Sequence, residues 1–207
     1  MEKRNFENEL PKGYKQALYI NAKKAKFGII FNLIALVVLA IVMTVSIIPL
    51  YYSGRFTLDI IKVGRLNYLV AMLVFVVALI GYIVLHELVH GIAYKILTGE
   101  KLTFGISWSC AFCGVPHIYT YRKTAIISVS APLVLFTLIL SPITALLYFV
   151  SPLYYLISAF ILGIHLGGCS GDIYVLLLLG VKFRKKNVLM RDTGPEQFFY
   201  VKEEENG

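Results

Sequence analysis

The chain has 207 residues, of which 58% are hydrophobic and 15% are charged. A soluble domain has about 45–50% apolar and about 25% charged residues, so this composition indicates a membrane protein and excludes a disordered or collagen-like chain. Three cysteines are too few for a disulfide scaffold. The excess of 20 basic over 12 acidic residues is typical of positively charged cytoplasmic segments, so we expect no nucleic-acid partner.

Four predominantly apolar stretches have the length of about 20 residues that a membrane-spanning helix needs. They lie at 27–50, 67–97, 124–150 and 153–180. The second is long enough to tilt, bend or project beyond the lipid, and Gly81 is a candidate bend point. The first 26 residues lack the apolar core and cleavage site of a signal peptide, so the first span should anchor the chain. We therefore predict an all-α membrane protein with four transmembrane helices, made of an N-terminal tail (1–26), a transmembrane domain (27–180) and a C-terminal tail (181–207).

Lys and Arg are distributed unevenly between these spans. Seven precede the first span and six follow the fourth, whereas three lie in the loop between the first and second spans. Three more lie in the loop between the second and third spans, with Lys95 just before it. Because Lys and Arg accumulate in cytoplasmic loops, we expect a multi-pass cell-membrane protein with both termini and this second loop in the cytoplasm.

The second loop is the only sizeable segment outside the predicted membrane. Its two β-prone runs, "KLTFGISW" and "SCAFCGVPHIYTY", and a Gly-Val-Pro turn signal predict a β-hairpin, with a plain amphipathic connector as the alternative. Cys110, Cys113 and His117 could form a second metal site or a redox pair, but no fourth ligand follows nearby. Cys169, in the fourth span, is expected to be a small helix-packing residue.

Ionisable residues inside the predicted spans are concentrated in the second and fourth. Three of the four histidines lie there, His86, His90 and His165, and so do two of the twelve acidic residues, Glu87 and Asp172. An ionisable side chain at membrane depth costs roughly 2.5–3.5 kcal/mol on insertion scales, so each of these residues needs a partner or a function.

His86, Glu87 and His90 form the pattern H-E-x-x-H. Residues four apart on a helix are only about 40° apart around its axis, so both imidazoles face the same side and could bind Zn²⁺ together. Glu87 could then act as the general base that activates a water molecule. The alternative is a buried histidine pair that is satisfied by neighbouring carbonyls, with Glu87 as a paired charge.

A catalytic zinc takes three protein ligands, and Asp172 is the candidate for the third. His90 and Asp172 lie seven and eight residues before the ends of two spans that run in the same direction, so both should reach a similar depth. The alternative for Asp172 is an ion pair with a basic residue of the C-terminal tail. His165 lies seven residues before Asp172, on the same helix face. It could orient a metal ligand or stabilise an oxyanion, and the alternative is an ordinary core histidine.

At these residues the chain resembles the site-2-protease type of intramembrane zinc metalloprotease. It is most similar to a family of small prokaryotic membrane proteins described as "putative zincin peptidases". The motifs that carry the resemblance lie within about residues 70 to 180 and are H-E-x-x-H at 86–90, the small-residue-proline stretch "SAPLV" at 130–134, and "GGCSGD" ending at Asp172. The larger site-2 proteases also have an asparagine-proline pair and often a PDZ domain, and this chain has neither.

The resemblance implies proteolysis within the membrane, with zinc as cofactor and membrane lipid and a peptide or transmembrane-protein substrate as partners. Two other classes of function remain open from the residues. One is a non-catalytic membrane protein in which a metal or a histidine–carboxylate network links two helices, and the other is a small metal or proton transporter. The substrate, the trigger and the oligomeric state are left open by the sequence.

Overall fold

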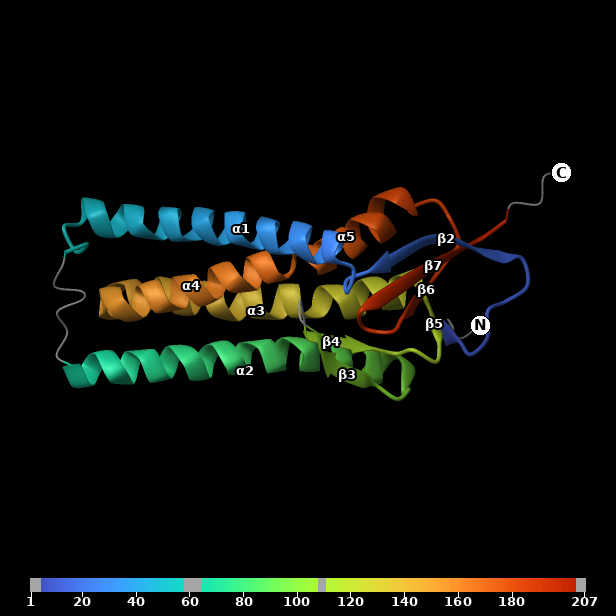
Figure 1. The fold of residues 1–207 in the computed structure, drawn as a ribbon, viewed down its shortest axis with the longest axis horizontal. Helices are drawn as coiled ribbons and strands as arrows, with labels where there is room; N and C mark the ends of the chain where they lie inside the picture. The colour runs from blue at the N-terminus through green and yellow to red at the C-terminus, as the bar shows by residue number, and fades with distance from the viewer. Residues whose placement is uncertain (1–4, 58–64, 108–110, 204–207) are drawn as a thin grey trace. The chain divides into compact units, whose positions relative to one another are not determined.

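The computed structural model describes residues 5–57, 65–107 and 111–203, and it combines long helices with two antiparallel sheets (Figure 1). The chain divides into two compact units. Unit 1 comprises the described residues of 1–30, 86–132 and 171–207, and unit 2 those of 31–85 and 133–170.

Four helical segments are long and apolar enough to cross a membrane, in agreement with the predicted spans. Three of them are the single helices α1 (Ala25–Tyr52), α2 (Arg65–Thr98) and α3 (Arg122–Val150). The fourth comprises α4 (Pro152–Gly168), α5 (Ser170–Leu177) and the π-helix η2 (Leu178–Lys182). α2 remains helical through Gly81, and the interruption lies instead at Cys169, which caps α4 through a 3.1 Å hydrogen bond from its N–H to the His165 carbonyl.

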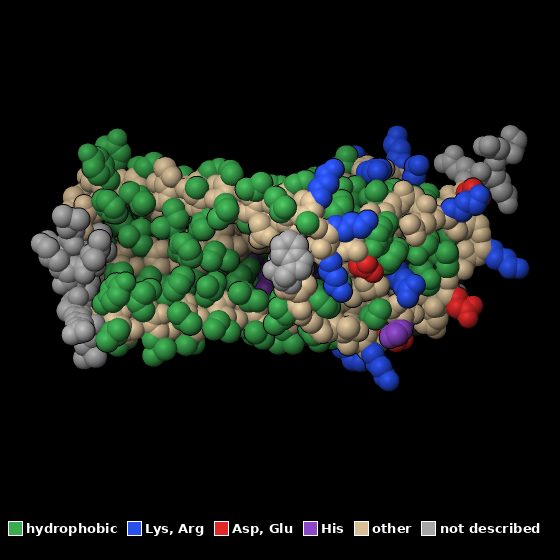
Figure 2. Space-filling model, in the orientation of Figure 1, with side chains coloured by type: hydrophobic (Ala, Val, Ile, Leu, Met, Phe, Trp, Pro, Cys, Tyr) green, Lys and Arg blue, Asp and Glu red, His purple; other side chains and the backbone are tan. Residues whose placement is uncertain are grey.

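Unit 2 is a bundle of apolar helices (Figure 1). Inside the bundle, the rings of Phe75 and Phe160 form a T-shaped pair with 5.4 Å between their centroids. The hydroxyls of Thr144 and Ser158 form a 2.7 Å hydrogen bond. Hydrophobic side chains cover the face of unit 2 that is seen in Figure 2, and Leu138 is more than two-thirds exposed. An exposed apolar surface of this size fits lipid rather than water as the surrounding medium.

Two glycines one turn apart bring α4 close to α1 within unit 2. A Cβ atom on Gly167 would lie 2.7 Å from the Ala35 carbonyl oxygen and 2.8 Å from the Ala35 Cα atom. A Cβ atom on Gly163 would lie 2.6 Å from Leu39 Cδ1. Small residues four apart allow two helix backbones to pack in direct contact, which is a main source of helix association in lipid.

We expect Gly167→Ala to destabilise the protein by about 1–3 kcal/mol, because the added methyl group meets helix backbone that cannot rotate away. The measurement is thermal unfolding of the purified protein in detergent. Gly168→Ala is the matched control, since a Cβ there has open space, and it should leave stability unchanged or raise it slightly. Equal effects of the two substitutions would show that the α1–α4 contact does not limit stability.

Unit 1 contains a five-stranded antiparallel sheet that the all-α prediction missed. Its strand order is β1-β5-β6-β7-β2. The strands are β1 (Phe6–Glu7), β2 (Tyr14–Asn21), β5 (Tyr119–Tyr121), β6 (Val188–Asp192) and β7 (Glu196–Lys202). Four of the five strands come from the two segments predicted as tails, so the fold is not all-α.

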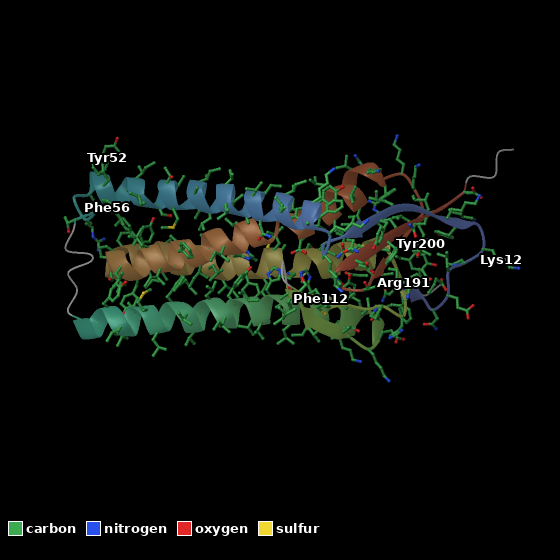
Figure 3. The ribbon with its side chains drawn as sticks, in the orientation of Figure 1. Lys12, Tyr52, Phe56, Phe112, Arg191 and Tyr200 are labelled. Atoms are coloured by element: carbon green, nitrogen blue, oxygen red, sulfur yellow. The ribbon has the colours of Figure 1, made fainter. Side chains whose placement is uncertain are left out.

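One face of this sheet forms a hydrophobic core with the ends of the helices. Phe199 of β7 and Met190 of β6 are paired across the strands and fully buried, together with Leu179 of the π-helix and Ala125 of α3. On the sheet, Tyr119 of β5 stacks edge-on against Tyr200 of β7, and the Arg191 guanidinium lies 5.8 Å from the Tyr119 ring centroid (Figure 3). The apolar residues of β6 and β7 are therefore buried by elements that lie far away in the sequence, such as the start of α3.

The second sheet is the predicted hairpin in the loop between α2 and α3. It pairs β3 (Thr103–Ile106) with β4 (Ala111–Gly114) in antiparallel register. The connection between the two strands spans residues 107–110, whereas the Gly-Val-Pro signal at 114–116 lies between β4 and β5. The hairpin prediction is thus confirmed, although the Gly-Val-Pro signal follows β4 and does not separate the two paired strands.

Candidate metal centre

His86 and His90 lie one turn apart on α2, and both side chains are buried. Each residue is only 8% exposed, and their ring centroids are 5.0 Å apart. The helix fixes this arrangement, because a spacing of four residues aligns two side chains along one face.

Asp172, in the first turn of α5, completes a compact group with these histidines. Its Oδ2 atom lies 3.4 Å from His86 Nε2, and its Oδ1 atom lies 3.5 Å from His90 Nε2. The three ligand atoms lie within 4.8 Å of one another. Ligands at 2.0–2.2 Å from a tetrahedral zinc are separated by about 3.3–3.6 Å, so each imidazole nitrogen lies at the distance from a carboxylate oxygen that two zinc ligands have.

A hydrogen bond sets the tautomer of His90. Its Nδ1 atom lies 2.9 Å from the Ser128 carbonyl oxygen of α3, and because a carbonyl can only accept, Nδ1 carries the proton. In the neutral imidazole, Nε2 then has the lone pair, on the side of the ring that faces Asp172. The Ser128 hydroxyl is buried and has no hydrogen-bond partner among the described residues, which is consistent with a further polar group in this region.

Glu87 is half-buried and lies next to His86 on a neighbouring face of α2. A hydrogen bond from the backbone of Cys113 in β4 reaches its carboxylate. The Glu87 carboxylate is not part of the three-residue ligand group. This position suits a residue that exchanges protons with a water molecule and does not bind the metal.

A buried carboxylate of β6, Asp192, was not singled out by the sequence. It accepts hydrogen bonds from the Tyr94 hydroxyl at 2.8 Å and from the Gly194 N–H at 2.9 Å. Burial raises the pKa of Asp192 to about 6, although both hydrogen bonds favour its charged form. Its only sequence signal was an acidic residue that follows the apolar run Val188–Met190 and Arg191 and that lies two residues before Gly194.

His165 belongs to unit 2 and is fully buried there. Its Nδ1 atom lies 3.0 Å from the Tyr82 hydroxyl of α2, and its Nε2 atom lies 3.0 Å from the Thr137 hydroxyl of α3. Both ring nitrogens therefore have hydroxyl partners that link three helices of the bundle. A part for His165 in orienting a ligand or stabilising an oxyanion stays a prediction.

The predicted C-x-x-C cluster is described only in part, because Cys110 lies outside the described residues. Burial raises the pKa of the Cys113 thiol to about 12, so this side chain stays protonated at neutral pH. A protonated thiol is a poor metal ligand and a poor nucleophile. His117 is exposed on the loop before β5.

The residues of the candidate metal centre lie within the part of the chain that matches a known protein family. The model of a family described as "Putative zincin peptidase" matches residues 79–186, which is more than half of the chain. This segment contains His86, Glu87, His90 and Asp172 and ends just before β6. No curated protein and no solved structure matches the chain.

Proposed function

The chain belongs to the family described as "Putative zincin peptidase", and from this premise we propose that it is a zinc-dependent endopeptidase that cleaves membrane-embedded polypeptides. The family description suggests a zinc metallopeptidase. The observation that carries the proposal is the group of His86, His90 and Asp172, in which each imidazole Nε2 lies 3.4–3.5 Å from a carboxylate oxygen, a separation typical of two ligands of a tetrahedral zinc.

Each residue of the centre has a distinct part in the proposed reaction. His86, His90 and Asp172 would hold the metal, and zinc when bound supplies a Lewis acid that polarises the scissile carbonyl and activates water. Glu87 takes the proton of the attacking water and returns it to the leaving amine. The Cys113 N–H holds the Glu87 carboxylate, and the Ser128 carbonyl holds the His90 ring.

Cleavage within the membrane is supported by the four apolar helical segments and by the aromatic residues at their ends. Tyr51, Tyr52 and Phe149 are more than two-thirds exposed where α1 and α3 finish, and such aromatic residues are typical of the lipid–water interface. Lys and Arg gather on unit 1 (Figure 2), which is the basis for proposing that unit 1 and both termini are cytoplasmic.

The hairpin supplies a candidate surface for substrate. A transmembrane substrate must unwind before a peptidase can reach its carbonyls, because helical hydrogen bonds shield them. β3 pairs on one side with β4, and its Phe104 and Ile106 side chains are exposed. We propose that the unwound segment pairs with β3 as an added strand.

The proposal is tested with the full chain purified in detergent. We expect one zinc per chain, cleavage of a single-span peptide that carries a fluorophore and a quencher, and loss of at least about 90% of this cleavage with 1,10-phenanthroline. Added zinc should restore it. Stoichiometric zinc without any cleavage would favour a structural metal site, and no bound zinc would refute the zinc-peptidase proposal.

A further inference from the structure

Beside its two histidines, α2 has a second row of residues that faces the hairpin. Glu87, Gly91 and Tyr94 are spaced by four and three residues, so they lie along one face of the helix. A Cβ atom on Gly91 would lie 2.8 Å from Phe104 Cζ and 3.2 Å from Cys113 Sγ. The hairpin is therefore in direct contact with α2 at the turn that follows Glu87.

Asp192, in the five-stranded sheet, forms hydrogen bonds both to α2 and to the residue that follows β4. The Asp192 carboxylate accepts the hydrogen bond of Tyr94 on α2, and the Asp192 carbonyl oxygen accepts one from the Val115 N–H, directly after β4, at 2.8 Å. Tyr94 is 1% and Asp192 is 5% exposed, so water does not compete for these bonds.

The turn that follows Asp192 is also packed tightly against β4. A Cβ atom on Gly114 would lie 2.3 Å from the Gly194 nitrogen and 2.9 Å from the Asp192 carbonyl oxygen. Gly194 has a φ of 97°, and the Phe112 ring (Figure 3) occupies the space that a side chain there would need. Backbone-to-backbone contact of this kind transmits a displacement of the turn directly to β4.

We infer that Asp192 is a positioning residue for the proposed general base: it holds β4 against α2, so that the Cys113 N–H stays on the Glu87 carboxylate. The inference rests on the proposed function for the part of Glu87, whereas the contacts themselves involve no metal. A general base held in one orientation reaches the attacking water more often than a freely rotating one, so loss of the hold lowers turnover rather than substrate binding.

The test combines amide hydrogen exchange with kinetics on the full zinc-loaded chain in detergent. Asp192→Ala and Tyr94→Phe should raise exchange of the Cys113 and Val115 amides by about tenfold, since each removes a buried charge-assisted hydrogen bond. Glu87→Ala should release the Cys113 amide alone. With the fluorophore–quencher peptide, Asp192→Ala should lower kcat by about tenfold while KM and zinc content stay within about twofold.

Two further variants separate positioning from general destabilisation. In Asp192→Asn the amide oxygen can still accept from the Gly194 N–H, and the amide NH2 can donate to the Tyr94 hydroxyl oxygen in place of accepting from it. This variant should therefore restore both amide protection and kcat. Tyr19→Phe removes a comparable 2.6 Å tyrosine–carboxylate bond, to Glu196, elsewhere in the sheet and should change neither.

The inference would be overturned if Asp192→Ala left hydrogen exchange of the Cys113 and Val115 amides unchanged. It would also be overturned if this variant raised the exchange but left kcat unchanged. A parent chain that fails to cleave the peptide, but loses protection at both amides on Asp192→Ala, would refute the proposed function and leave the positioning contact established.

Discussion

Glu87→Gln is expected to lower peptide cleavage by at least about a hundredfold while the protein retains one zinc per chain. General acid–base catalysis contributes about 10²–10⁴ in rate, and the amide of Gln cannot accept the proton of the attacking water. Zinc should stay bound because Glu87 is outside the group of His86, His90 and Asp172. The measurements are metal analysis and cleavage of the fluorophore–quencher peptide by the same preparation.

The control for this variant is Glu9→Gln, which makes the same chemical change at an exposed position of the N-terminal segment. It should leave both zinc content and turnover unchanged. If Glu87→Gln retained the cleavage rate of the parent chain, Glu87 could not be the base. If the variant lost zinc as well, Glu87 would have to be counted among the residues that hold the metal.

Asp172→Ala is expected to weaken zinc binding by at least about a hundredfold and to abolish cleavage with it. Removal of this carboxylate leaves two imidazoles on one helix, and two ligands do not make a stable tetrahedral site. Competition for zinc with a coloured chelator measures the affinity directly, so the result does not depend on finding a good substrate.

Gly171→Ala is the control for a local change in α5, since a Cβ atom at this neighbouring residue has open space. It should bind zinc as tightly as the parent chain. An unchanged affinity in Asp172→Ala would mean that the third protein ligand is another residue. Circular dichroism of each variant shows whether the helical content is preserved.

The helical part of the fold could be predicted from the sequence because each span carries its own signal. Apolar length alone marks 27–50 and 124–150 as helices, without knowledge of their neighbours. The same holds for His86 and His90, whose relation is set by helix geometry. Asp172 was found by a different argument, the match of depth between two spans, and the structure brings its carboxylate to 3.4–3.5 Å from both rings.

The sheet could not be predicted in the same way because its strands have distant partners. β2 pairs with β7, and Tyr14 lies opposite Lys202, so neither strand is recognisable from its own neighbourhood. The β2 run Tyr-Lys-Gln-Ala-Leu-Tyr-Ile-Asn is polar enough to be read as part of a charged tail. The contact of Asp192 with Tyr94 could not be predicted for the same reason, since only the folded sheet brings these two residues together.

The strand order also constrains biosynthesis. β6 and β7 are formed by residues 188–202, yet they occupy the middle of the sheet, between β5 and β2. While the ribosome is still translating the last span, β2 has no strand to pair with, β5 can pair only with β1, and Asp192 has not been made. The contact between Asp192 and Tyr94 can therefore form only after all four helical segments have been translated, so the sheet is completed last.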